Sequence, residues 1–104
     1  MIYVMNSPIL TAYGRYTYER IDVAQARQLL KKPFESAIGH EATAKFLSKL
    51  VGVEVPVNRV SIAMRPGDVA VIFRVKQRLE EGKVLTEGEL RKVPYELGLL
   101  RREE

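Results

Sequence analysis

The sequence contains no cysteine and only one histidine, His40, among its 104 residues. Without thiols the chain can form neither a disulfide nor a thiolate metal site, and one imidazole is too little for a structural zinc site. No apolar run approaches the roughly 18 residues that a membrane-spanning helix needs. The first residues lack the basic start and the small-residue cleavage site of a signal peptide. We therefore expect a cytoplasmic protein with no metal and no membrane partner.

Positive charge is only slightly in excess, since 17 Lys and Arg stand against 13 Asp and Glu and the net charge is +4. This excess favours an anionic partner. No run of basic residues is longer than two, so we expect no binding of duplex DNA. The length fits one domain over residues 1–104, and the 46% of hydrophobic residues can fill a core.

The hydrophobic pattern predicts an α/β fold in which short strands alternate with helices. The first strand, at residues 1–6, is expected to form a loose hairpin with a strand at Tyr16–Tyr18. A continuous apolar run, Val69–Phe73, is expected to be the most buried strand. The remaining strands are expected at 34–38, 60–64 and 95–99, and the tail at 101–104 is expected to fray.

Local signals mark where the helices begin and end. Asp22 can cap a helix that Pro33 stops, and a second helix follows His40 and is closed by Gly52. Thr86 and Glu89 have the spacing of a capping box for a short last helix. Between the second helix and the last helix, the sequence at 65–68 is typical of a type II turn.

His40 follows a short strand and Gly39, at the start of the second helix. A helix start exposes unpaired backbone N–H groups, which suit a phosphate, and histidine can give or take a proton near neutral pH. Together these features are the minimum equipment for cutting a phosphodiester without a metal. The alternative is that His40 is a turn residue or a helix cap.

Other candidate residues follow the ends of strands. Arg78 and Glu81 come after the buried strand, so they can meet His40 at one edge of a parallel sheet. Arg78 can make a forked contact with a phosphate, and Glu81 can orient Arg78 or His40. Arg59, Asn6 and Ser7 are further polar candidates. The alternative for each is an ordinary turn or surface residue, and the Arg78–Glu81 pair would then contribute little.

Five blocks of the sequence, in order along nearly the whole chain, resemble the viral ring nucleases that counter type III CRISPR defence. The block around His40, with the order Ser-Ala-Ile-x-His-Glu-Ala-Thr, is the most specific. The blocks are Asn6–Thr11, Ser36–Ala44, Val55–Arg59, Pro66–Asp68 and Arg78–Gly82.

This resemblance implies a small mixed sheet of about five strands, flanked by helices, in a homodimer. It implies metal-independent cleavage of cyclic tetra-adenylate to linear di-adenylates, without a cofactor. His40 would protonate the leaving oxygen, with Arg78 and Glu81 beside it. Substrate contacts are expected from Asn6, Ser7, Ser36, Gly39 and Arg59.

Two rival functions remain open at this point. One is a non-catalytic module that binds a cyclic oligonucleotide or nucleic acid through the same basic edge. The other is a structural dimer that has no ligand. Turnover separates the enzyme from the binding module, and stabilisation by ligand separates both from the structural dimer.

Overall fold

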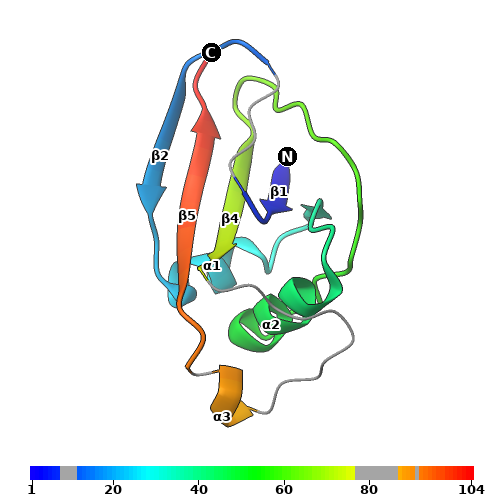
Figure 1. Ribbon diagram of the computed structural model, residues 1–104. Coiled ribbons are helices and arrows are strands. Elements are labelled where there is room, and N and C mark those ends of the chain that lie inside the picture. The colour runs from blue at the N-terminus through cyan, green and yellow to red at the C-terminus, as the bar shows by residue number, and fades with distance from the viewer. Residues whose placement is uncertain (8–11, 77–86, 91) are drawn as a thin grey trace.

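The computed structural model describes residues 1–7, 12–76, 87–90 and 92–104. In these residues five strands form one mixed sheet in the order β2-β5-β4-β1-β3 (Figure 1). The strands are β1 (Ile2–Met5), β2 (Tyr16–Arg20), β3 (Glu35–Ser36), β4 (Val69–Val75) and β5 (Tyr95–Arg102), and the helices are α1 (Val23–Leu29), α2 (Glu41–Val51) and α3 (Glu87–Leu90). The predicted α/β class and mixed sheet are therefore confirmed.

The centre of the sheet is β4, which pairs with β1 in parallel and with β5 in antiparallel orientation. Val71 and Phe73 point to the face that carries α1 and α2, where they join Phe46 and Leu47 in the main core. All four are almost fully buried. The prediction that the apolar run 69–73 is the most buried strand is confirmed.

The opposite face of the sheet carries a smaller core and no helix in the described part of the chain. Met5, Ile72 and Leu100 lie on this face, because alternate residues of a strand point to opposite sides. Met64, from the segment that returns from α2 to β4, covers them. That segment runs past the β3 edge of the sheet as an extended connection (Figure 1).

The predicted caps are found where the sequence places them. Asp22 caps α1 with a complete capping box, and Gly52 ends α2 in the left-handed conformation at φ +70°. Gly67 has φ +91° in the turn before β4, and the Asp68 N–H donates to the Arg65 carbonyl at 2.9 Å. Thr86, the predicted start of the last capping box, lies outside the described residues.

Three strand predictions are wrong. β2 does not pair with β1 but lies at the far edge of the sheet against β5. Residues 60–64 form no strand, although their apolar residues alternate. The C-terminal end is ordered: β5 continues to Arg102, whose guanidinium donates to the Tyr13 carbonyl at 2.9 Å.

Candidate functional site

The parallel strands β3, β1 and β4 end at one edge of the sheet, and polar residues follow each of them. The register sets β1 between the other two, with Val4 opposite both Ser36 and Val71. Asn6 and Ser7 follow β1, His40 follows β3 after a short loop, and Lys76 follows β4. In α/β sheets ligands bind outside the carboxyl ends of the strands, so this edge is the candidate site.

Beside this edge, the structure brings Asn6 and Ser7 together with Ser61 in a pocket of about 100 Å³. Its other lining residues are Met5, Ala37, Val60 and Ile62. Sequence reasoning missed the contribution of 60–62, because their alternation suggested a strand and not a loop. His40 and Arg59 do not line this pocket.

The loop that ends at His40 is held by the segment 56–59. The Ser36 hydroxyl, buried with its side chain, donates to the Pro56 carbonyl at 2.6 Å and accepts from the Ile38 N–H at 3.3 Å. Asn58 adds two bonds, from its amide side chain to the Ser36 carbonyl and from its N–H to the Ile38 carbonyl, both at 2.8 Å. Ser36 therefore fixes the loop, and its predicted contact with a ligand stays a prediction.

Gly39 and Arg59 lie directly against each other. The Arg59 Nε donates to the Gly39 carbonyl at 2.8 Å, and a Cβ on Gly39 would come within 3.1 Å of the Arg59 Cγ. A residue without a side chain is therefore favoured at position 39. This contact attaches the guanidinium of Arg59 to the loop just before His40.

His40 is the N-cap residue of α2. Its Nδ1 accepts from the Thr43 N–H at 3.4 Å, a long and weak hydrogen bond, and the Thr43 Oγ1 lies at the same distance from Nδ1. Because Nδ1 faces the helix, Nε2 is the nitrogen directed away from the helix start. The alternative reading of His40 as a helix cap is thus confirmed, and the cap uses Nδ1 of the ring.

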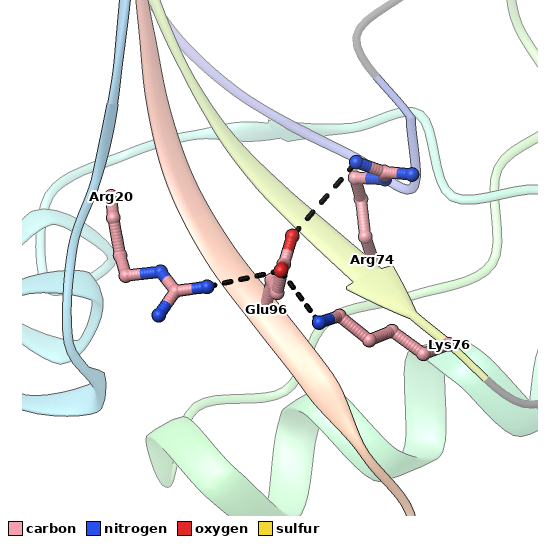
Figure 2. Close-up of polar contacts among 4 residues, drawn as sticks. All are labelled: Arg20, Arg74, Lys76 and Glu96. Atoms are coloured by element: carbon pink, nitrogen blue, oxygen red, sulfur yellow. Dashed lines mark hydrogen bonds and ion pairs between the residues drawn. The ribbon is translucent and has the colours of Figure 1, made fainter.

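A cluster of charges lies where β4 and β5 meet at the same edge of the sheet (Figure 2). The Glu96 carboxylate contacts Lys76 Nζ at 2.7 Å, Arg20 at 3.0 Å and Arg74 at 3.8 Å. The hydrogen bond from Lys76 lowers the pKa of Glu96, and the attraction of Lys76, Arg20 and Arg74 adds to this effect. Three cations around one carboxylate leave an excess of positive charge, which suits an anionic ligand.

Arg78 and Glu81, the predicted partners of His40, lie outside the described residues. Elsewhere in the described part of the chain, no group of three or more His, Asp or Glu side chains is arranged to hold a metal ion. The helices described here are all too short or too polar to cross a membrane.

The family model described as STIV B116-like matches residues 2–97. The chain belongs to this family. B116 of Sulfolobus turreted icosahedral virus, a solved STIV B116-like structure, superposes with a TM-score of 0.82 at 27% identity, covering 97% of this chain and 98% of its own. Both the family model and the structural match therefore include β1, β3 and β4, the strands that end at the candidate site.

Relatives of this STIV B116-like chain occur in viruses and in a bacterium. Protein 26 of Sulfolobus islandicus filamentous virus (isolate Iceland/Hveragerdi) is 39% identical, over 95% of this chain and 89% of the relative. YddF of Bacillus subtilis (strain 168) is 35% identical, over 94% of each chain. The resemblance to a family of viral proteins is thus confirmed, and a bacterial relative shares nearly the whole chain.

Proposed function

We propose that this protein is a metal-independent ring nuclease that opens cyclic tetra-adenylate and thereby antagonises type III CRISPR signalling. The observation that carries the proposal is the placement of His40. It lies at a helix start, beside the edge where β1, β3 and β4 end, with Nδ1 accepting from the Thr43 N–H. A proton donor there is held beside backbone N–H groups that favour a phosphate.

In the proposed reaction a ribose 2′-hydroxyl attacks the adjacent phosphorus and the bond to the 5′-oxygen breaks. The imidazolium of His40 gives its Nε2 proton to that leaving oxygen, and the product ends in a 2′,3′-cyclic phosphate. The nucleophile belongs to the substrate, so correct geometry supplies much of the rate. Arg78 and Glu81 are assigned beside the phosphate through the resemblance, and Asn6, Ser7 and Arg59 are assigned to the ligand.

We further propose that the active form is a homodimer. Among the described residues, the pocket that Asn6, Ser7 and Ser61 line, about 100 Å³, is smaller than the roughly 300–1,000 Å³ of pockets that enclose small ligands. A ring of four adenylates has repeating phosphodiesters, and a two-fold axis would set two His40 side chains on opposite bonds. The excess of positive charge around Glu96 supports an anionic ligand at this edge of the sheet.

A non-catalytic binding module is the second candidate, because capping α2 already gives His40 a structural purpose. The two are separated by incubating the purified protein with cyclic tetra-adenylate in EDTA and resolving the products by chromatography. The ring nuclease yields linear di-adenylates, and a linear tetra-adenylate of the same sequence serves as a marker. A protein that raises its melting temperature with the ring but returns it intact is a binding module.

A further inference from the structure

The contacts of His40 at the start of α2 involve two polar groups of Thr43, the backbone N–H and the hydroxyl. The Thr43 N–H and the Thr43 Oγ1 each lie 3.4 Å from Nδ1 of the ring. Thr43 is buried, with 8% of the residue exposed. Within the described residues, His40 Nδ1 is the one hydrogen-bond partner of this hydroxyl.

The two contacts differ in what they allow at Nδ1. A backbone N–H can only donate, so it fits a ring whose Nδ1 carries a lone pair. That neutral ring has its proton on Nε2. It is no acid near neutral pH, because loss of that proton would leave an imidazolate. The capping bond alone therefore holds His40 in an inactive form.

The acid of the proposed reaction is the imidazolium, which carries protons on both nitrogens. When Nε2 gives its proton to the 5′-oxygen, the neutral ring that remains keeps its proton on Nδ1. In both forms Nδ1 is a donor that faces another donor, the Thr43 N–H. A hydroxyl can donate or accept, so the Thr43 Oγ1 can accept from Nδ1 in both forms.

We propose that Thr43 is a positioning residue whose hydroxyl accepts the Nδ1 proton of His40, both in the charged acid and after proton transfer. This role rests on the proposed function, since it supplies the acid form that the reaction consumes. The nearby charges are already paired or attached: Glu41 contacts Lys45 at 2.9 Å, and Arg59 donates to the Gly39 carbonyl. Substitutions of Thr43 leave these groups in place.

The test compares Thr43→Val, which has the same shape without the hydroxyl, with Thr43→Ser, which keeps the hydroxyl. His40 is the only histidine, so nitrogen NMR of the ligand-free protein reports one imidazole at each pH. We expect His40 in the Val variant to lose its positive charge at lower pH than His40 in the other two proteins. The neutral ring of His40 in this variant should carry its proton almost wholly on Nε2. Its kcat should fall about 10- to 100-fold, as for a lost hydrogen bond to a charged group, with KM little changed.

Equal titration and equal proton placement in wild type, Val and Ser proteins would overturn the role of Thr43. A loss of kcat in the Val variant without any NMR change would also overturn it, because Thr43 would then act on the fold alone. If the NMR differences appear but wild-type protein never opens the ring, the proposed function fails while the hydrogen bond to Thr43 stands. Recovery of both readouts in the Ser variant supports the proposal.

Discussion

Two serines have different parts at the candidate site. Ser36 supports the loop before His40, whereas Ser61 lines the pocket. Ser36 is buried and bonded to the backbone of both the loop before His40 and the segment beside it. Ser36→Ala should lower the free energy of unfolding by about 1–3 kcal/mol, because the N–H of the buried Ile38 and the Pro56 carbonyl lose their partner. Denaturant unfolding monitored by circular dichroism measures this loss.

Ser61→Ala is the matched substitution at an exposed residue that lines the pocket with Asn6 and Ser7. It should change the free energy of unfolding by no more than about 0.5 kcal/mol and should weaken binding of cyclic tetra-adenylate. The account of the two serines is wrong if Ser36→Ala leaves stability unchanged and weakens only ligand binding. Ser36 would then be a ligand contact, as the sequence predicts.

Among the strands, Glu96 links β5 to β2 and β4 through ion pairs. It contacts Arg20 at the end of β2, Arg74 on β4 and Lys76 just after β4 (Figure 2). Lys76, through its hydrogen bond, does most to lower the pKa of Glu96 below its usual 4.5. A carboxyl whose pKa is lower in the folded state stabilises the fold above the unfolded pKa, and this contribution is lost as the pH falls through the folded pKa.

Glu96→Gln should therefore be less stable than wild type near pH 7, and the difference should shrink below about pH 4.5. The effect should be small and should weaken with salt, because the three cations around Glu96 are half-exposed or more. Glu19→Gln on β2 is the control, since Glu19 makes no ion pair in the described part of the chain. Melting temperatures at pH 7 and pH 3.5 test this, and a Glu96 difference that does not shrink in acid would contradict it.

The central strand β4 carries the core. Val71 is fully buried between β1 and β5, so Val71→Asp would place an unpaired charge there. Such a charge costs about 3–5 kcal/mol, against a total stability of about 5–15 kcal/mol for a small domain. We expect the Asp variant to show no cooperative melting transition. Val57→Asp makes the same change at a residue that is 43% exposed and should melt like wild type; equal melting of both variants would show that the core is wrongly assigned.

The sequence predicts the parts of this fold that depend on neighbouring residues. Asp22, Gly52, and Pro66 with Gly67 act within a few residues, and each cap or turn is found as predicted. The apolar composition of 69–73 also predicts that this strand is buried. Arrangements that depend on distant partners are less visible in the sequence.

The strand at Tyr16–Arg20 illustrates what the sequence does not show. Its tyrosines favour a strand, but its partner β5 lies about eighty residues later, with Tyr18 opposite Leu100. Nearness in sequence suggested β1 instead. In the same way, the alternation at 60–64 reflects a loop that packs Met64 and Ile62 against the second face of the sheet. At the site, the place of His40 follows from its loop and helix start, whereas its contact with Thr43 required the side-chain geometry.

At the scale of the whole molecule, the proposed dimer predicts that each chain cuts one of two opposite bonds of the ring. Hetero-dimers of wild type with His40→Asn, isolated through two different tags, should accumulate linear tetra-adenylate, because only one histidine can act. Wild-type dimers should convert the ring quickly to di-adenylates. Chromatography of the products over time measures both.

Wild-type dimers carrying the same two tags control for the tags. Hetero-dimers that form di-adenylates as fast as this control, with no linear tetramer, would show that one chain suffices and that the two-site dimer is wrong.

The most direct test of the central claim separates the cap made by His40 from its proton donation. Asparagine is among the best N-cap residues but cannot act as a general acid, so His40→Asn should keep the melting temperature and the binding of cyclic tetra-adenylate. Single-turnover cleavage of the ring in EDTA, at saturating protein, is the measurement. We predict that the Asn variant cleaves about 10²–10⁴-fold more slowly than wild type. A slowing of less than about threefold, far below that range, would contradict the account, because His40 would then be only a helix cap.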